Sequence, residues 1–238
     1  NGSTDRSVEI AEANGARVVH CAARGYGNAL RAGFAAAEGD WIIMGDADQS
    51  YDFGEIPRFW EKIKEGNDLV MGSRLKGTIM KGAMPPLHQY LGNPVLSRIV
   101  RILFRTPLSD SHCGLRAFTK QALERMDLRT TGMELASEIV MKSALNGLKV
   151  AEIPITLHPD ARDRAPHLRS FRDGWRHLRY MLMMAPNWLF VFPGVVALLL
   201  GALMIAALLP GPLVVGTVTL DVHTMLLGMA FVLLGVYL

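Results

Sequence analysis

An uncharged apolar segment near the C-terminus places the strongest constraint on what this chain can fold into. Trp188 to Leu209 are 22 consecutive residues without an Asp, Glu, Lys or Arg. As an α-helix they would extend about 33 Å, enough to cross a hydrocarbon core of roughly 30 Å. Pro210-Gly211-Pro212 ends this segment, and a second apolar run, Met225 to Leu238, continues to the last residue. We therefore predict a transmembrane region of about two helices over residues 188–238, the second of them truncated.

A basic segment lies directly before this apolar region. Between Asp160 and Arg179 the sequence has six arginines and three aspartates, which equals the net charge of +3 of the whole chain. Basic residues beside a transmembrane helix mark its cytoplasmic end and attract anionic lipid head groups. The charge therefore indicates a membrane surface rather than nucleic acid as partner, although a solvated helix could carry the same charges. We expect an integral membrane protein whose preceding domain is cytoplasmic.

The same segment has an apolar stripe with helical spacing. Residues at intervals of three and four form it, and most of the arginines lie off it: Leu168, Phe171, Trp175, Leu178 and Leu182. The pattern predicts a basic loop and an amphipathic interfacial helix over residues 161–187, with the apolar face in lipid. A helix that packs on a protein core would have the same stripe.

The cysteines and the chain ends give weaker indications. Cys21 and Cys113 lie far apart, without a Cys-x-x-Cys or histidine partner spacing. Unpaired structural thiols in a reducing compartment are therefore expected, with neither a disulfide nor a zinc site. The sequence begins with Asn1 rather than Met, and both ends look truncated.

Helix and strand patterns alternate before the basic segment. A helix is expected from Asp5 to Asn14, capped by Ser3 or Thr4 and ended by Gly15. The further expected elements are a strand at Arg17–Cys21, an alanine-rich helix after Gly27, a strand at Trp41–Met44, a helix at Glu55–Lys64 and a strand at Asp68–Gly72. This alternation predicts an α/β domain over residues 1–160 with right-handed βαβ units and a mostly parallel sheet.

Two aspartates follow the strand at Trp41–Met44. In such sheets ligands bind beyond the carboxyl ends of strands, where Asp46 and Asp48 are expected to lie. Two carboxylates at i and i+2 can bind a hard cation such as Mg²⁺ or Mn²⁺ while substrate phosphates supply further ligands. Alone, the pattern also occurs in ordinary acidic turns.

Two further motifs support a phosphate-binding site. Arg24-Gly25-Tyr26-Gly27 precedes a helix whose first amides could face a phosphate or nucleotide, although the pattern does not complete G-x-G-x-x-G. Gly72-Ser73-Arg74 ends another expected strand and places a permanent cation on the same side of the sheet.

Six motifs in order complete a known pattern. They are NGSTD, ARGYGNALRAG, GDAD, MGSR, SHCGLRAF and GMELASEIVMKSALNGLKVAEIPI. Together they resemble the family 2 glycosyltransferases, and among these the polyprenyl-phosphate (dolichyl-phosphate) sugar transferases, over roughly residues 1–185. The resemblance implies a GT-A (Rossmann-like) catalytic domain and an inverting transfer of a hexose from a UDP- or GDP-sugar to a polyprenyl phosphate.

The resemblance also implies roles for particular residues. Asp46 and Asp48 would hold Mg²⁺ or Mn²⁺ against the donor diphosphate. The nucleotide sugar would contact Asp5, Arg24, Gly27, Arg162, Arg164 and His167, the last three in a loop that closes over the diphosphate. Arg74 would meet the acceptor phosphate, and Asp48, Arg74 and Asp110 would be the catalytic group. Asp110 is preferred over Glu134 and Glu138, which share a helix face that an ordinary ion-pair helix would also have.

The sequence departs from the family pattern at two places. Some relatives have a Gln four residues after the first Asp, where this chain has Ser50, and its Gln49 comes one place early. An arginine for the acceptor phosphate would be expected between Leu87 and Leu91, where the sequence reads LHQYL and offers only His88.

Two other functions remain open from the sequence. A processive polysaccharide synthase would share the fold and the membrane helices, but the expected Gln-x-x-Arg-Trp motif is missing from this sequence. A non-catalytic membrane scaffold would be expected to lose the metal-binding aspartates, and both are present. The sugar, the base, the polyprenol and the formation of a homo-oligomer are left undetermined.

Overall fold

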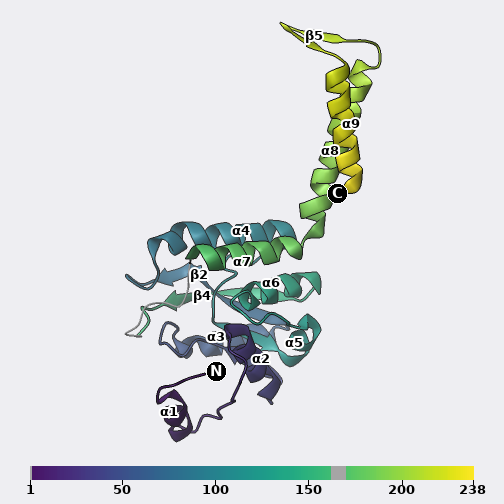
Figure 1. Cartoon of the computed structure of the whole chain (residues 1–238). Coiled ribbons are helices and arrows are strands. Elements are labelled where there is room, and N and C mark those ends of the chain that lie inside the picture. The colour runs from purple at the N-terminus through teal and green to yellow at the C-terminus, as the bar shows by residue number, and fades with distance from the viewer. Residues whose placement is uncertain (1, 162–169) are drawn as a thin grey trace. The chain divides into compact units, whose positions relative to one another are not determined.

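The computed structural model describes residues 2–161 and 170–238, and it forms two compact units, Asn1–Met181 and Leu182–Leu238. The first unit is an α/β domain and the second a pair of apolar helices (Figure 1). The division between the two units lies within the helix Ser170–Met183 and coincides with neither predicted boundary. The boundaries at residues 160 and 187 therefore stay predictions.

The first unit is built on a four-stranded mixed sheet. Its order is β1 (Trp41–Met44), β3 (Arg116–Thr119), β2 (Leu69–Ile79) and β4 (Val150–Leu157). The pairs β1–β3 and β2–β3 are antiparallel, and β2–β4 is parallel. The expectation of a mostly parallel sheet is therefore wrong. The chain leaves the carboxyl end of β2 and returns at the same end to begin β3, a reversal that helix–strand alternation cannot reveal.

Helical segments make up the rest of the regular structure described for this unit, and Ser7–Ala13 among them buries no residue. They are α1 (Ser7–Ala13), α2 (Tyr26–Ala36), η1 (Phe53–Glu55), α3 (Ile56–Lys64), η2 (His88–Gly92), α4 (Asn93–Phe104), α5 (Lys120–Met126), α6 (Leu135–Leu145) and α7 (Ser170–Met183). The core between them contains Tyr51, Phe59, Ile63, Val70, Leu115, Ala117, Ile153 and Ile155. The strand at Trp41–Met44 and the helix at Glu55–Lys64 are thus confirmed.

The N-terminal segment differs from its prediction. The chain at Arg17–Cys21 forms no strand, and Val19 is exposed. A strand requires a neighbour that satisfies its backbone groups, and none lies beside this segment among residues 2–161 and 170–238. The first turn of α1 is held by Asp5 Oδ1, which accepts from the Ser7 N–H at 3.1 Å, rather than by Ser3 or Thr4.

The inward face of α7 is polar. Asp173 and His177 are buried together with Met181, and the His177 ring lies 2.8 Å from Ser137 Oγ on α6. Trp175, on the apolar stripe seen in the sequence, is 63% exposed. Leu178 and Leu182, the other described positions of the stripe, are partly buried, so the placement of this helix at an interface stays a prediction. Leu168 and the Phe171 side chain lie outside the described residues.

The second unit is a helical hairpin (Figure 1). Helix α8 (Phe192–Leu208) continues η3 (Asn187–Val191), and α9 (Val222–Tyr237) follows a hairpin of β5 (Leu213–Val215) and β6 (Val218–Leu220). A Cβ atom at Gly201 would lie 2.4 Å from Gly228 O, so only glycine permits this close helix approach. Within the described residues, only Asn187–Leu208 is long and apolar enough to span a bilayer. Two membrane helices therefore stay a prediction.

Candidate active site

Three segments of the first unit meet at one end of the sheet. Because β3 runs antiparallel to β1 and β2, residue Arg116 at its start lies opposite both Met44 and Met71. The turn after β1, the loop before β3 and the continuation of β2 therefore meet at this end. These segments contain the aspartates, the Ser111–Gly114 loop and Arg74 that the sequence singled out.

Asp46 lies against the backbone of the Ser111–Gly114 loop. A Cβ atom at Gly114 would be only 2.5 Å from Asp46 Oδ2, so glycine is required for this close approach. The Gly114 N–H donates to the hydroxyl of Tyr51 at 2.8 Å. Burial, reinforced by the charge of Asp46, raises the pKa of Tyr26 to about 12, so this phenol stays protonated.

Asp48 is half-buried in a turn that Ser50 stabilises. Asp48 Oδ1 accepts hydrogen bonds from the N–H and hydroxyl of Ser50, at 3.1 and 2.5 Å. The residue at which the chain departs from the family pattern thus orients one of the two aspartates. The segment after β4 returns to this turn, since the Ala161 N–H donates to Asp48 O at 3.0 Å.

The donor set at this turn suits a hard divalent cation. Carboxylate oxygen is the ligand that Mg²⁺ and Mn²⁺ prefer, and both aspartates are partly exposed. Within residues 2–161 and 170–238, no group of three His, Cys, Asp or Glu side chains could complete a cage. Two carboxylates leave further coordination positions of such a cation to other oxygen ligands.

Arg74 is held in place by a buried carboxylate. Arg74 Nε donates to Asp110 Oδ2 at 2.7 Å, Nη2 donates to Oδ1 at 2.8 Å, and the backbone N–H donates to Oδ2 at 3.0 Å. The Asp110 side chain is 0% exposed and that of Arg74 is 10% exposed. Burial favours the neutral acid, but the charge and hydrogen bonds of Arg74 outweigh it and lower the pKa of Asp110.

The geometry favours a positioning role for Asp110, and its direct catalytic role stays a prediction. Arg74 occupies both of its carboxylate oxygens, and no part of the side chain is accessible to a substrate. Asp110 orients Arg74 through these contacts. The sequence does not indicate which way the Asp110 side chain points.

Glu152 on β4 fixes the loop that contains Asp110. Its carboxylate accepts from the N–H groups of Ser109 and Asp110 at 2.8 and 3.0 Å. It also pairs with Lys76 Nζ at 2.6 Å, with its own side chain 6% exposed. The sequence offered no signal for Glu152, because its partners are more than forty residues away.

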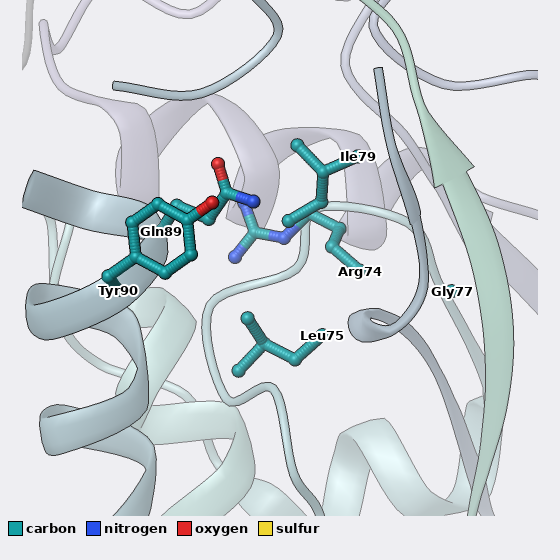
Figure 2. A pocket seen from close by; sticks show the side chains of 6 residues that line it. All are labelled: Arg74, Leu75, Gly77, Ile79, Gln89 and Tyr90. Carbon is teal, nitrogen blue, oxygen red and sulfur yellow. The ribbon is translucent and has the colours of Figure 1, made fainter. Parts of the chain in front are cut away.

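A pocket of about 260 Å³ opens beside Arg74 (Figure 2). Its lining residues are Arg74, Leu75, Gly77, Ile79, Gln89 and Tyr90. Figure 2 shows the guanidinium group of Arg74 and the carboxamide of Gln89 directed toward each other. His88 is not among the lining residues, whereas Gln89 and Tyr90, which follow it, are. A contact of His88 with the acceptor phosphate stays a prediction.

A fully buried arginine fixes the Ser111–Gly114 loop. Arg116 donates to the carbonyl oxygens of Cys113, Ala136 and Ser111 at 2.7, 2.8 and 3.1 Å. Burial lowers the pKa of this guanidinium, although nearby phenol, thiol and carboxyl groups oppose the change. Arg116 thereby connects the loop to α6, a role that the SHCGLRAF motif did not reveal.

The glycines before α2 have a packing explanation. Cβ atoms at Gly25 and Gly27 would lie 2.4 Å from Thr131 O and 2.5 Å from Thr130 O, respectively. The buried carboxylate of Glu138 holds the segment at Thr130 by accepting from the Thr130 N–H at 2.9 Å. A contact of Gly27 with a nucleotide stays a prediction, and Glu138 is a structural residue.

The other residues predicted to contact the nucleotide lie near the N-terminus or outside the described residues. Asp5 accepts from the Ser7 N–H at the start of α1, and Arg24 is exposed beside Gly2, whose Cβ position is 3.4 Å from Arg24 Nε. Their contacts with a nucleotide stay predictions. Arg162, Arg164 and His167 lie outside the described residues. Glu134 keeps a buried oxygen, Oε2, without a hydrogen-bond partner in the part of the chain that the structure describes.

Comparison with known sequences identifies the family. The sequence model of "Glycosyl transferase family 2" matches residues 1–127, more than half of the chain. The chain belongs to glycosyl transferase family 2. This membership confirms the resemblance on which the sequence analysis relied.

The sequence relatives include two hexose-transferring enzymes of Haloferax volcanii. The chain is 44% identical over 225 residues to the low-salt glycan biosynthesis hexosyltransferase Agl6 of Haloferax volcanii, covering 94% of this chain and 54% of that protein. It is 34% identical over 157 residues to a dolichyl-phosphate hexose transferase of the same organism, covering 65% of this chain and 66% of that protein. The chain thus spans between half and two thirds of the length of these relatives.

Solved structures confirm the GT-A-like fold. A glucosyl-3-phosphoglycerate synthase of Mycobacterium tuberculosis, crystallised with Mn²⁺, UDP and glucosyl-3-phosphoglycerate, aligns with a TM-score of 0.58 at 20% identity. The alignment covers 78% of this chain and 67% of that one. A second mycobacterial protein aligns with a TM-score of 0.61 at 19% identity, covering 78% and 63% of the two chains.

Proposed function

We propose that this protein transfers a hexose from a nucleoside diphosphate sugar to a polyprenyl phosphate at the cytoplasmic face of a membrane. The observation that carries this proposal is the placement of two different anion-binding features at one end of the sheet. The aspartate turn at Asp46 and Asp48 suits a metal-bound diphosphate, and the Arg74 pocket suits a second phosphate. Family membership and the hexosyltransferase relatives support the same reaction.

The donor is assigned to the aspartate turn. Asp46 and Asp48 would hold Mg²⁺ or Mn²⁺, which stabilises the negative charge that develops on the departing diphosphate. Ser50 keeps the carboxylate of Asp48 in one orientation through its two hydrogen bonds. Such preorganisation reduces the reorganisation that the site must undergo when the donor binds.

The acceptor is assigned to the Arg74 pocket. Asp110 uses Nε, Nη2 and the backbone N–H of Arg74, while the hydrogen bonds of the described residues leave Nη1 available to a ligand. The carboxamide of Gln89 and the hydroxyl of Tyr90 add neutral donors at the same pocket. One charged and two neutral donors suit a phosphate monoester that is bound and released in each turnover.

The chemistry requires little proton transfer. A lipid phosphate should be largely ionised at neutral pH, since a phosphate monoester has a second pKa of about 6. One of its oxygens attacks the anomeric carbon, the bond to the nucleoside diphosphate breaks, and the diphosphate leaves with the electron pair. No general base is needed, which agrees with an active-site end where the buried carboxylate of Asp110 is already committed to Arg74.

The test is a transfer assay with the full chain in nanodiscs. Polyprenyl phosphate is supplied with a panel of UDP- and GDP-hexoses, and the sugar-bearing lipid and the released nucleoside diphosphate are measured with and without Mg²⁺ or Mn²⁺. We expect metal-dependent glycolipid formation with one donor, retained by the exposed-carboxylate control D40N and lost in D48A. Absence of glycolipid with every donor, from folded protein, would refute the proposal.

A further inference from the structure

Helix α4 has two faces of opposite character. Ser97, Val100 and Phe104 are buried against the first unit. Leu91 of η2, Val95 and Ile102 are 57%, 45% and 50% exposed. At 100° per residue these three side chains fall within about 40° of one another, on the side opposite to the buried face. The helix therefore presents an apolar stripe away from the core that it packs on.

The charged residues in the sequence segment that contains this stripe are all basic. Between Asp68 and Asp110 the sequence has no Asp or Glu and six Lys or Arg residues. Of these, Arg98 lies on the stripe itself, and Arg101, Arg105 and Lys81 are exposed near it. In the described parts of the chain, none of these four forms an ion pair with a carboxylate within 4.0 Å. A water-facing helix would ordinarily carry both signs of charge.

We propose that the outward face of η2–α4, formed by Leu91, Val95, Arg98 and Ile102, docks onto an anionic lipid bilayer surface. Leu, Val and Ile side chains can enter the boundary between head groups and acyl chains. The arginines can extend toward lipid phosphates while their aliphatic stems stay in the apolar layer. A second copy of this chain fits this face less well, because the face has no acidic residue to complement its own arginines.

Two features next to η2–α4 agree with a lipid partner. Gln89 and Tyr90 of η2 line the Arg74 pocket, so a bilayer in contact with Leu91 would lie next to that pocket. Figure 1 shows α7 on the same side of the first unit as α4. The exposed residues of α7 include Trp175, Arg176 and Arg179, again an aromatic ring with cations.

The proposal does not depend on sugar transfer, and its test does not measure it. Leu91 and Ile102 are replaced singly by Cys in the full chain, in a Cys21→Ser background that leaves only the fully buried Cys113. Each is labelled with an environment-sensitive fluorophore and placed in nanodiscs with or without 30% phosphatidylglycerol. The control is Leu145→Cys at the end of α6, where the native side chain is also 57% exposed.

Contact with lipid is measured as quenching of the fluorophore by nitroxide-labelled phospholipid. We expect at least threefold stronger quenching at positions 91 and 102 than at 145, with blue-shifted emission, in the anionic nanodiscs. The triple variant R98Q/R101Q/R105Q should lose most of this difference, and the charge-retaining R98K/R101K/R105K should keep it. Equal quenching at all three positions would overturn the proposal. Blue-shifted emission without lipid quenching would overturn it as well, since a protein would then cover the face.

Discussion

The two halves of the candidate active site are built in opposite ways. The aspartate turn is partly exposed, and Asp48 accepts hydrogen bonds from the N–H and hydroxyl of the nearby Ser50. The Arg74 half is buried, and its carboxylate partner accepts three hydrogen bonds from Arg74 alone. The exposure of the aspartate turn suits a site that binds and releases ligands in each turnover. The burial of the other half suits a site that keeps the Arg74 guanidinium in one position. Substitutions in the two halves should therefore fail in different ways.

The largest effect is expected from breaking the buried pair. Asp110→Ala leaves the Arg74 guanidinium buried without a counter-charge, which should cost about 3–5 kcal/mol of unfolding free energy. The control is Asp127→Asn, which removes the charge from an exposed pair with Arg129 and suits the left-handed backbone at this position, so that it should cost far less. Thermal or urea unfolding of the purified proteins measures both. Equal losses in the two variants would contradict the assignment of Asp110 as a positioning residue.

A loss of activity without a loss of stability is expected at the aspartate turn. Asp48→Ala should lower kcat by about 10²–10³-fold, the range for removing one preorganised electrostatic element of a transition state. Unfolding free energy should change by less than about 1 kcal/mol, since the side chain is only half-buried. Steady-state transfer kinetics beside an unfolding curve measure both quantities. A variant that retains activity would remove Asp48 from the donor site.

The contrast between the halves was only partly predictable from sequence. The turn after β1 could be predicted because an apolar strand, a glycine and two aspartates are adjacent in the chain. Arg116 and Glu152 could not, because each side chain is buried by contacts with distant backbone groups. The basic character of the α4 face was also not evident from the net charge. The formal charges outside residues 160–179 cancel, although the segment between Asp68 and Asp110 contains no acidic residue.

The pH dependence of stability sharpens the same comparison. The pKa of Asp110 is lower in the folded protein than its unfolded value of about 3.9. The stabilisation from this pair is therefore complete above pH 4 and is lost as the pH falls through the folded pKa. Urea unfolding of the wild type should weaken over this acid range, and Asp110→Asn should lack that part of the slope. Identical acid slopes in the two proteins would contradict the ionised pair.

The smallest effect is expected at the pocket wall. Gln89→Ala removes one neutral donor beside Arg74 and should raise the KM for polyprenyl phosphate about 3–10-fold, corresponding to about 1 kcal/mol. The kcat and the KM for the donor should stay near the wild-type values. Gln121→Ala, an exposed glutamine on α5, is the control. A change in the KM for the donor, with an unchanged KM for polyprenyl phosphate, would indicate that Gln89 contacts the donor rather than the acceptor.

The central claim is that the Arg74 half receives an ionised lipid phosphate, and one comparison of acceptors tests it most directly. Polyprenyl phosphate and polyprenol of equal chain length are supplied in identical nanodiscs, with the accepted nucleotide sugar and metal, and the glycolipid formed is quantified. The account predicts product with the phosphate and none with the alcohol, because the site has a fixed cation for a phosphate and needs no general base. Equal or faster transfer to the alcohol would contradict it.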